Sequence, residues 1–200
     1  MPARRARHGR GQALPARPAR ALPAGTLVRR FFLGLDEALS VRLRPLAERR
    51  AGRAALAALA HSGDSLVDFP ALAAWWYLET GFVPGGGAFR TLAAALAATL
   101  VATGAKYLFR RKRPEGDWGG IYRRTDPHSF PSGHAARTMA IAVAALSAGV
   151  GPVAALLAWS LAVGASRVAL GVHHASDVLA GWALGGLFGA VALGLPFPPA

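Results

Sequence analysis

Ionisable residues are concentrated in one short stretch between two long apolar segments. Residues 166–177 contain Arg167, His173, His174 and Asp177. Ionisable side chains at the edge of a hydrocarbon layer are costly, which makes them candidates for function. If a helix begins near His173, Asp177 lies one turn further along the same face, where its carboxylate can hold the imidazole in one tautomer and stabilise its cation. The stretch fits an activated nucleophile or base, and it equally fits a polar cluster that anchors a helix end.

A second cluster directly precedes another apolar segment. Pro131 is followed by Ser132, Gly133 and His134. Ser132 can cap the coming helix, whose free backbone N–H groups point towards any anion placed there, and glycine lets the backbone approach a ligand closely. His134 then lies at the mouth of a site, able to give a proton to a leaving oxygen. The alternative is an ordinary helix cap with an interfacial histidine.

A third cluster pairs Lys106 with Arg113, seven residues later. Seven residues are close to two helical turns, so both cations can face one pocket. Arginine presents a planar fork that matches phosphate oxygens, whereas lysine is a point charge. The alternative is a set of cations that flank a membrane span, and this explanation accounts for Arg110, Arg111 and Lys112. In the loop that follows, Asp126 and His128 could touch a lipid headgroup.

The composition indicates a membrane protein. The chain has 200 residues, of which 53% are hydrophobic and 16% charged, and its mean hydropathy is +0.32. Thirteen of the 23 Lys and Arg residues precede Ala54, and the long apolar runs between the basic clusters exceed what a soluble domain of this size can bury. We therefore expect an all-α fold, and we interpret the net charge of +13 as cytoplasmic flanks of membrane spans rather than as a nucleic-acid-binding surface. Cysteine is absent, which excludes a disulfide framework and a thiolate metal site.

The predicted organisation has three parts. Residues 1–26 are expected to form a disordered basic tail that attaches to anionic lipid headgroups. Residues 27–62 are expected to form an amphipathic helical segment that lies on the membrane and is kinked or divided at Pro45. Residues 63–200 are predicted to be a membrane helix bundle of about five transmembrane helices. The predicted spans are 66–82, 89–109, 135–150, 153–170 and 175–195.

Counting these spans brings the three polar clusters to one face of the membrane. The ends at Arg113, at His134 and at residues 167–173 all lie on the same side. Segments far apart in the sequence therefore converge on one site. With the basic N-terminus in the cytoplasm, two spans return the chain to the cytoplasmic side before Arg113, so the site is predicted to face the cytoplasm. The alternative is that residues 39–59 also span the membrane, which would place the site outside.

The three clusters together resemble the three-part motif of the type 2 phosphatidic acid phosphatase superfamily. In chain order they are Lys106-x6-Arg113-Pro114, then Pro131-Ser132-Gly133-His134, then Ser166-Arg167-x5-His173-x3-Asp177. The resemblance covers roughly residues 64–195, with every motif position matched in order and spacing. That superfamily includes lipid phosphate phosphatases, bacterial phosphatidylglycerophosphate and polyprenyl diphosphate phosphatases, and vanadium haloperoxidases.

The resemblance implies a role for each motif residue. His173 would attack phosphorus and form a phosphohistidine, Asp177 would orient and charge-stabilise His173, and His134 would protonate the leaving group. The motif spacing selects His173 rather than His174. The residues implied to bind the phosphoryl oxygens are Lys106, Arg113, Ser132, Gly133 and Arg167. Because these motifs carry no carboxylate cluster of the kind that holds Mg²⁺, we expect a reaction that needs neither a metal ion nor a cofactor.

The expected function is a phosphatase of a bacterial plasma membrane that acts on a lipid phosphate or diphosphate. The composition, rich in Arg, Ala and Gly, fits a bacterium of high GC content. Polyprenyl-linked substrates, such as decaprenylphosphoryl-5-phosphoribose or a polyprenyl diphosphate, are favoured over phosphatidic acid and phosphatidylglycerophosphate. The hydrophobic spans argue against a soluble haloperoxidase, and the intact histidines and Asp177 argue against a non-catalytic lipid-phosphate-binding protein.

Overall fold

The computed structural model describes residues 24–114, 126–149 and 153–194. Within these ranges the chain is helical apart from turns, loops and an isolated bridge between Lys112 and His128. The predicted all-α class is therefore confirmed. The elements are α1 (Ala24–Leu43), η1 (Arg44–Ala47), α2 (Arg50–His61), α3 (Ser65–Thr80), α4 (Gly86–Phe109), α6 (Gly133–Ala144), η2 (Ala145–Ala148), α7 (Val153–Ala169) and α8 (Ala175–Gly194).

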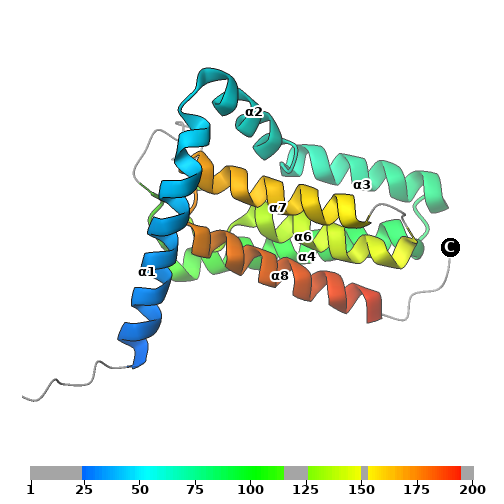
Figure 1. Cartoon of the computed structure of the whole chain (residues 1–200). Helices are drawn as coiled ribbons and strands as arrows, with labels where there is room; N and C mark the ends of the chain where they lie inside the picture. Colours follow the sequence, from blue (N-terminus) through cyan, green and yellow to red (C-terminus); the bar gives the residue numbers. More distant parts are fainter. Residues whose placement is uncertain (1–23, 115–125, 150–152, 195–200) are drawn as a thin grey trace, which may run out of the picture.

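The helices form a bundle with one helix across its end. Helices α3, α4, α6, α7 and α8 run in roughly the same direction or its reverse, and α1 crosses their end steeply, with α2 leading from α1 towards α3 (Figure 1). The last turns of α4 and α7 and the first turns of α6 and α8 lie at the end that α1 crosses. The predicted convergence of the three clusters at one end is thus present in the fold.

Helix α6 is the centre of the bundle, and small residues let its neighbours approach it closely. Glycines spaced four apart on α8 face the α6 backbone, so that a Cβ on Gly181 would lie 2.5 Å from the Ser132 oxygen and one on Gly185 would lie 2.1 Å from the Ala136 oxygen. Such close packing of small residues is typical of helices that associate in membranes. The buried alanine core is Ala94, Ala98, Ala102, Ala136, Ala140, Ala144 and Ala192. This packing fixes the start of α6 against the start of α8.

Among the described residues, two helices, α4 and α8, are long and apolar enough to cross a membrane by length and composition. Helix α7 is apolar but has 17 residues, and α3 and α6 have 16 and 12. The bounds of α3 and α7 lie within two residues of the predicted 66–82 and 153–170. A full span takes about 20 residues, so α3, α6 and α7 are shorter than that. For α6 the reason is local, because the helix tightens into η2 and ends at Gly149, whose φ is +62°.

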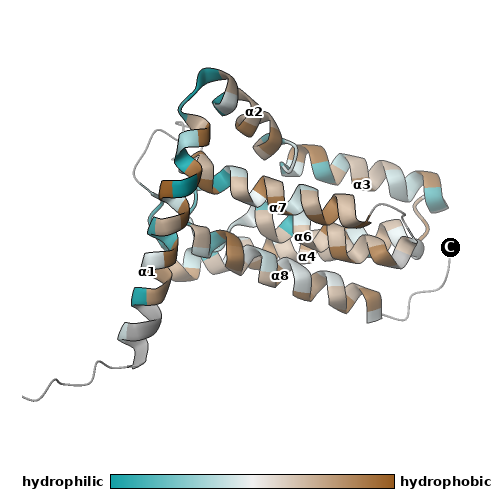
Figure 2. Cartoon of the chain, viewed as in Figure 1, coloured by the Kyte–Doolittle hydropathy of each residue, from teal (hydrophilic) through white to brown (hydrophobic). Residues whose placement is uncertain are grey.

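The segment before the bundle is helical as expected, but its apolar residues divide between two environments. Leu39 and Leu43 of α1 pack against a cluster that includes Val168 and Val178, whereas Phe31 is 67% exposed. Helix α1 ends just before Pro45, which lies in the first turn of η1, so the chain is divided at this proline. Hydrophilic residues gather on α1, on the start of α2 and at the crossed end of the bundle, while apolar residues dominate α7 and α8 (Figure 2). Of the predicted tail, residues 1–23 lie outside the described residues and 24–26 begin α1.

Candidate active site

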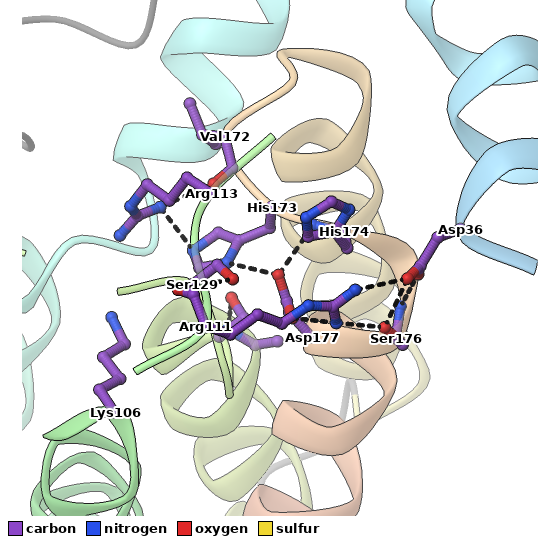
Figure 3. A network of polar contacts seen from close by, with 12 residues as sticks. Asp36, Lys106, Arg111, Arg113, Ser129, Val172, His173, His174, Ser176 and Asp177 are labelled. Carbon is purple, nitrogen blue, oxygen red and sulfur yellow. Dashed lines mark hydrogen bonds and ion pairs between the residues drawn. The ribbon is translucent and has the colours of Figure 1, made fainter. Parts of the chain in front are cut away.

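His173 and Asp177 form a buried pair at the start of α8. The His173 and Asp177 side chains are 1% and 0% exposed, and His173 Nδ1 lies 3.5 Å from Asp177 Oδ2 (Figure 3). The other ring nitrogen, Nε2, lies 3.3 Å from Arg113 Nη1. Arginine has only donors, so Nε2 is the acceptor and the proton of the neutral ring is on Nδ1, facing Asp177. The lone pair of a nucleophile is therefore on Nε2.

The electrostatic surroundings keep this imidazole neutral. Burial, followed by the positive charges of Arg113, Arg167 and Lys106, holds the pKa of His173 well below its ordinary value. A neutral ring retains the lone pair that attack on phosphorus requires. Arg167 is 2% exposed in the last turn of α7, so the third motif's cation lies within electrostatic range of the histidine.

The turn between α7 and α8 places His173 beside this cation. Gly171 has a φ of +69°, in the left-handed region that a residue without a Cβ adopts readily. The amides of Val172 and His173 both donate to the Arg167 carbonyl oxygen, at 3.1 and 3.3 Å. The chain thus folds back on the end of α7, which fixes the imidazole over the site.

Lys106 and Arg113 converge on one anionic oxygen. Lys106 Nζ and Arg113 Nη2 both pair with Asp126 Oδ2, the latter at 2.7 Å, and Arg113 Nε donates to the Asp126 carbonyl oxygen at 2.9 Å. Burial raises the pKa of Asp126, but Lys106 and Arg113 outweigh it, and the net shift is downwards. The two predicted cations therefore form an anion-binding place, which the ionised carboxylate of a loop residue occupies.

His134 has a carboxylate partner that the sequence patterns did not single out. In the first turn of α6, its Nε2 lies 2.5 Å from Asp64 Oδ1, and Asp64 Oδ2 lies 2.7 Å from His61 Nδ1. Burial raises the pKa of Asp64, but its hydrogen bonds with His134 and His61 lower it further, so the net pKa is below the usual range. Asp64 directly precedes α3, and the count of spans that brought His134 to this membrane face also brings Asp64 there.

Ser132 and Gly133 lie at the start of α6, as predicted. Ser132 caps α6 by accepting from the Ala135 amide, and its own amide donates to the Asp177 carbonyl oxygen at 2.9 Å. Among the described residues, a Cβ on Gly133 would meet nothing within 4 Å, so their packing does not require glycine there. Gly133 instead borders a cavity of about 400 Å³, which leaves space for a ligand beside it. The cavity is also lined by Asp64, Lys106, Asp126, His128, His134 and Arg137.

Arg111 corrects the sequence interpretation. The sequence predicts a cation that flanks a membrane span, but Nη1 of Arg111 donates to Asp177 Oδ1 and its Nη2 to Asp36 Oδ2, each at 2.7 Å. His174 presents its backbone amide to Asp177 Oδ2 at 2.8 Å. The structure thus adds Arg111, Asp36 and Asp64 to the predicted residues. Each joins the site through a contact between distant parts of the chain, which motif spacing does not reveal.

Known proteins share part of this sequence and most of this fold. Decaprenylphosphoryl-5-phosphoribose phosphatases of two Mycobacterium tuberculosis strains, CDC 1551 / Oshkosh and H37Rv, are each 39% identical over 110 residues. That match covers 54% of this chain and 57% of the relatives, so the chain spans little more than half of their length.

The similarity to solved structures covers more of the chain. The first transmembrane PAP2 type phosphatidylglycerolphosphate phosphatase from Bacillus subtilis is similar with a TM-score of 0.65 and 25% identity, over 84% of this chain and 94% of that one. Aquifex aeolicus LpxE shares the fold, with a TM-score of 0.63 and 24% identity over 82% and 94%. These membrane relatives and the apolar helices α4 and α8 indicate a membrane location.

A family model matches residues 87–198, more than half of the chain and the part that carries all three motifs. The chain belongs to the PAP2 superfamily.

Proposed function

We propose that this protein is an integral-membrane phosphatase that hydrolyses a lipid phosphate or diphosphate through a phosphohistidine on His173. The observation that carries the proposal is the state of that imidazole. Its Nδ1 faces Asp177 and its Nε2 lone pair lies among three buried cations, where a phosphoryl group would bind. A histidine in this state is a nucleophile whose developing positive charge already has a partner.

The reaction divides between the two histidines. His173 Nε2 attacks phosphorus in line with the leaving oxygen; the P–N bond forms as the P–O bond breaks, and His134 gives its proton to the departing oxygen. Water then attacks phosphorus, the P–N bond breaks, and His134 takes the proton from that water. Lys106, Arg113 and Arg167 offset the charge on the non-bridging oxygens. We propose that these side chains suffice without a metal ion or cofactor.

Polyprenyl-linked phosphates are the proposed substrate class, with decaprenylphosphoryl-5-phosphoribose as the first candidate. The support is the 39% identity to the mycobacterial phosphatases over 110 residues. The fold is compatible with a substrate that stays in the bilayer, because the anion-binding place lies at the ends of apolar helices. Phosphatidylglycerophosphate is the comparison substrate, because the Bacillus subtilis structure is similar to this chain at 25% identity.

Phosphate release by detergent-purified protein tests the proposal. The panel contains polyprenyl-phosphoryl-phosphoribose, polyprenyl diphosphate, phosphatidic acid and phosphatidylglycerophosphate, all in the presence of EDTA. We expect release that is lost in His173→Ala and largely kept in the adjacent His174→Ala, whose ring the mechanism does not use. If the folded protein releases no phosphate from any lipid but binds one of them, the protein is a lipid-phosphate-binding protein instead.

We also propose that the site faces the cytoplasm. The main support for this orientation is a group of exposed arginines around the junction of α1 and α2, at the site end of the bundle. They are Arg42, Arg44, Arg49 and Arg50. The sequence that links α3 to α4 and the sequence after α8 contain no Lys or Arg. Basic flanks are retained on the cytoplasmic side. A reporter fused after Pro199 would report an external C-terminus on this proposal, and a cytoplasmic signal would overturn it.

The basic N-terminal part is the proposed attachment to anionic lipid. Phe31 and Leu46 are 67% and 55% exposed on the same segment as the exposed arginines, which suits an interface between headgroups and hydrocarbon. The test is sedimentation of a peptide of residues 1–62 with vesicles. We expect binding to vesicles that contain phosphatidylglycerol and none to pure phosphatidylcholine; equal binding to both would contradict the proposal.

A further inference from the structure

A carboxylate from outside the family match is buried next to the site. Asp36, in α1, is 5% exposed, although α1 mostly lies on the surface. Its Oδ1 accepts from the Ser176 amide at 2.7 Å, and its Oδ2 accepts from the Ser176 hydroxyl at 2.9 Å and from Arg111 Nη2 at 2.7 Å. The family match begins at residue 87, so no motif assigns Asp36 a role.

Arg111 connects Asp36 to the proposed nucleophile. The same guanidinium donates through Nη1 to Asp177 Oδ1 at 2.7 Å, and the other oxygen of Asp177 faces His173 Nδ1 at 3.5 Å. Figure 3 shows the resulting chain of contacts, from Asp36 through Arg111 and Asp177 to His173. The side chains of Asp36, Asp177 and His173 are all less than 10% exposed and that of Arg111 is 28% exposed, so solvent screens these interactions only in part.

The charges along this series of contacts explain why a second carboxylate is useful. Asp177 must retain negative charge towards His173, because the imidazole becomes positive when Nε2 bonds to phosphorus. An arginine that paired with Asp177 alone would neutralise that charge. Because Asp36 accepts from the second nitrogen of Arg111, two carboxylates share one guanidinium, and one negative charge is left over for the imidazole. Asp36 also fixes the guanidinium on the side of Asp177 away from His173.

We propose that Asp36 is a positioning residue for the phosphatase reaction, acting through Arg111 and Asp177 on His173, so that the N-terminal helix α1 forms part of the site. This inference rests on the proposed function. It assigns α1 more than membrane attachment, because its docking on α8 sets the state of the nucleophile. Asp36 itself touches neither the substrate nor the reacting atoms.

Steady-state kinetics of the full chain in detergent provide the first test. Asp36→Asn keeps the shape and removes the charge, Asp36→Glu restores the charge, and Glu37→Gln removes the neighbouring exposed charge on α1 as the matched control. We expect Asp36→Asn to lower kcat by about 10- to 100-fold, by analogy with the loss of an outer hydrogen-bond partner of a metal-binding histidine. KM should change little, because the phosphate-binding cations remain; Asp36→Glu should recover part of kcat, and Glu37→Gln should match the wild type.

Nitrogen NMR of protein labelled with ¹⁵N-histidine provides a test that needs no substrate. The chain has six histidines, and the spectrum of His173→Ala assigns the signals of His173. We expect Asp36→Asn to shift the His173 Nδ1 resonance and Glu37→Gln to leave it in place. If Asp36→Asn does not fold, Asp36→Ser, whose hydroxyl can still bond to Ser176, replaces it in both tests.

The outcomes separate this inference from the proposed function. A folded Asp36 variant with wild-type kcat and unchanged His173 resonances would overturn the inference, as would a variant that only melts at a lower temperature. If the wild type releases no phosphate from any lipid but the His173 resonances still move in Asp36→Asn, the proposed function fails, while the connection from Asp36 to His173 is upheld.

Discussion

The site contains two histidine–carboxylate pairs that differ in burial and in neighbours. His173 and Asp177 are 1% and 0% exposed and lie 3.5 Å apart, with Arg111 also bound to the carboxylate. His134 and Asp64 are 16% and 29% exposed and lie 2.5 Å apart, and the second neighbour of this carboxylate is another histidine. The first pair is closed to solvent, whereas the second borders the cavity.

This difference assigns the two histidines to different chemistry. Burial and three cations lower the pKa of His173, which keeps a lone pair available on Nε2. His134 is in contact with a partly exposed carboxylate and borders the cavity, so a proton can reach it from there. A nucleophile must be held neutral until it reacts, while an acid–base group must exchange its proton in every cycle. Equivalent pairs could not meet both requirements.

The largest expected effect separates the histidines by the covalent intermediate. With ³²P-labelled nitrophenyl phosphate and an alkaline quench, which preserves phosphohistidine, His173→Ala should yield no labelled protein. His134→Ala should accumulate label, because nitrophenolate leaves without a proton while the attacking water still needs a base. Labelled His173→Ala protein would contradict the assignment of the nucleophile. The absence of label in both variants, when the wild type is labelled, would contradict the separate role of His134.

The second-largest expected effect is a difference in kcat between variants of the two carboxylates. Asp177→Asn should lower kcat by on the order of 10³- to 10⁴-fold, as when other catalytic histidines lose the group that fixes their tautomer. Asp64→Asn should lower kcat by only about tenfold, because it weakens one hydrogen bond to a partly exposed ring. Phosphate release at saturating lipid measures both, with circular dichroism melts to confirm that each variant folds. Equal losses of kcat would mean that the two histidine–carboxylate pairs contribute equally to the reaction.

The leaving group should divide the two histidines in a third way. His134→Ala should reduce turnover of an alkyl or prenyl phosphate about 10²-fold more than turnover of nitrophenyl phosphate, because only the alkoxide needs a proton as it departs. The measurement is the ratio of the initial rates of phosphorylation of the enzyme by the two substrates. Asp177→Asn serves as the control and should slow both substrates alike. A constant ratio in His134→Ala would remove its role as the acid.

The sequence predicts the first pair better than the second for a physical reason. His173 and Asp177 are four residues apart at a helix start, so local helix geometry places them together. His134 and Asp64 are 70 residues apart, and Asp36 and Ser176 are 140 apart. These contacts depend on the angle at which α1 crosses the bundle and on the glycine packing of α8 against α6. Hydropathy alone sets neither.

The smallest expected effect concerns Asp126, whose carboxylate already pairs with Lys106 and Arg113 beside His173. The Asp126 carboxylate occupies Lys106 and Arg113 and must give way when a phosphoryl group binds. Asp126→Asn removes this competition, so inorganic phosphate should inhibit about three- to tenfold more strongly, equivalent to roughly 1 kcal/mol for a partly exposed ion pair.

The pH dependence of this inhibition gives the control. Because the pKa of Asp126 is lowered, its carboxylate stays charged throughout the neutral range and competes until the pH falls through that lowered pKa. The pairing stabilises the native loop above the ordinary carboxyl pKa, about 3.9, and is lost on the acid side. The difference in phosphate inhibition between wild type and Asp126→Asn should therefore be constant from pH 6 to 8.

Asp64→Asn should leave phosphate inhibition unchanged, since the Asp64 carboxylate holds an imidazole rather than the phosphate-binding cations. Stronger inhibition in Asp64→Asn would place the anion between the two pairs and would contradict their separation.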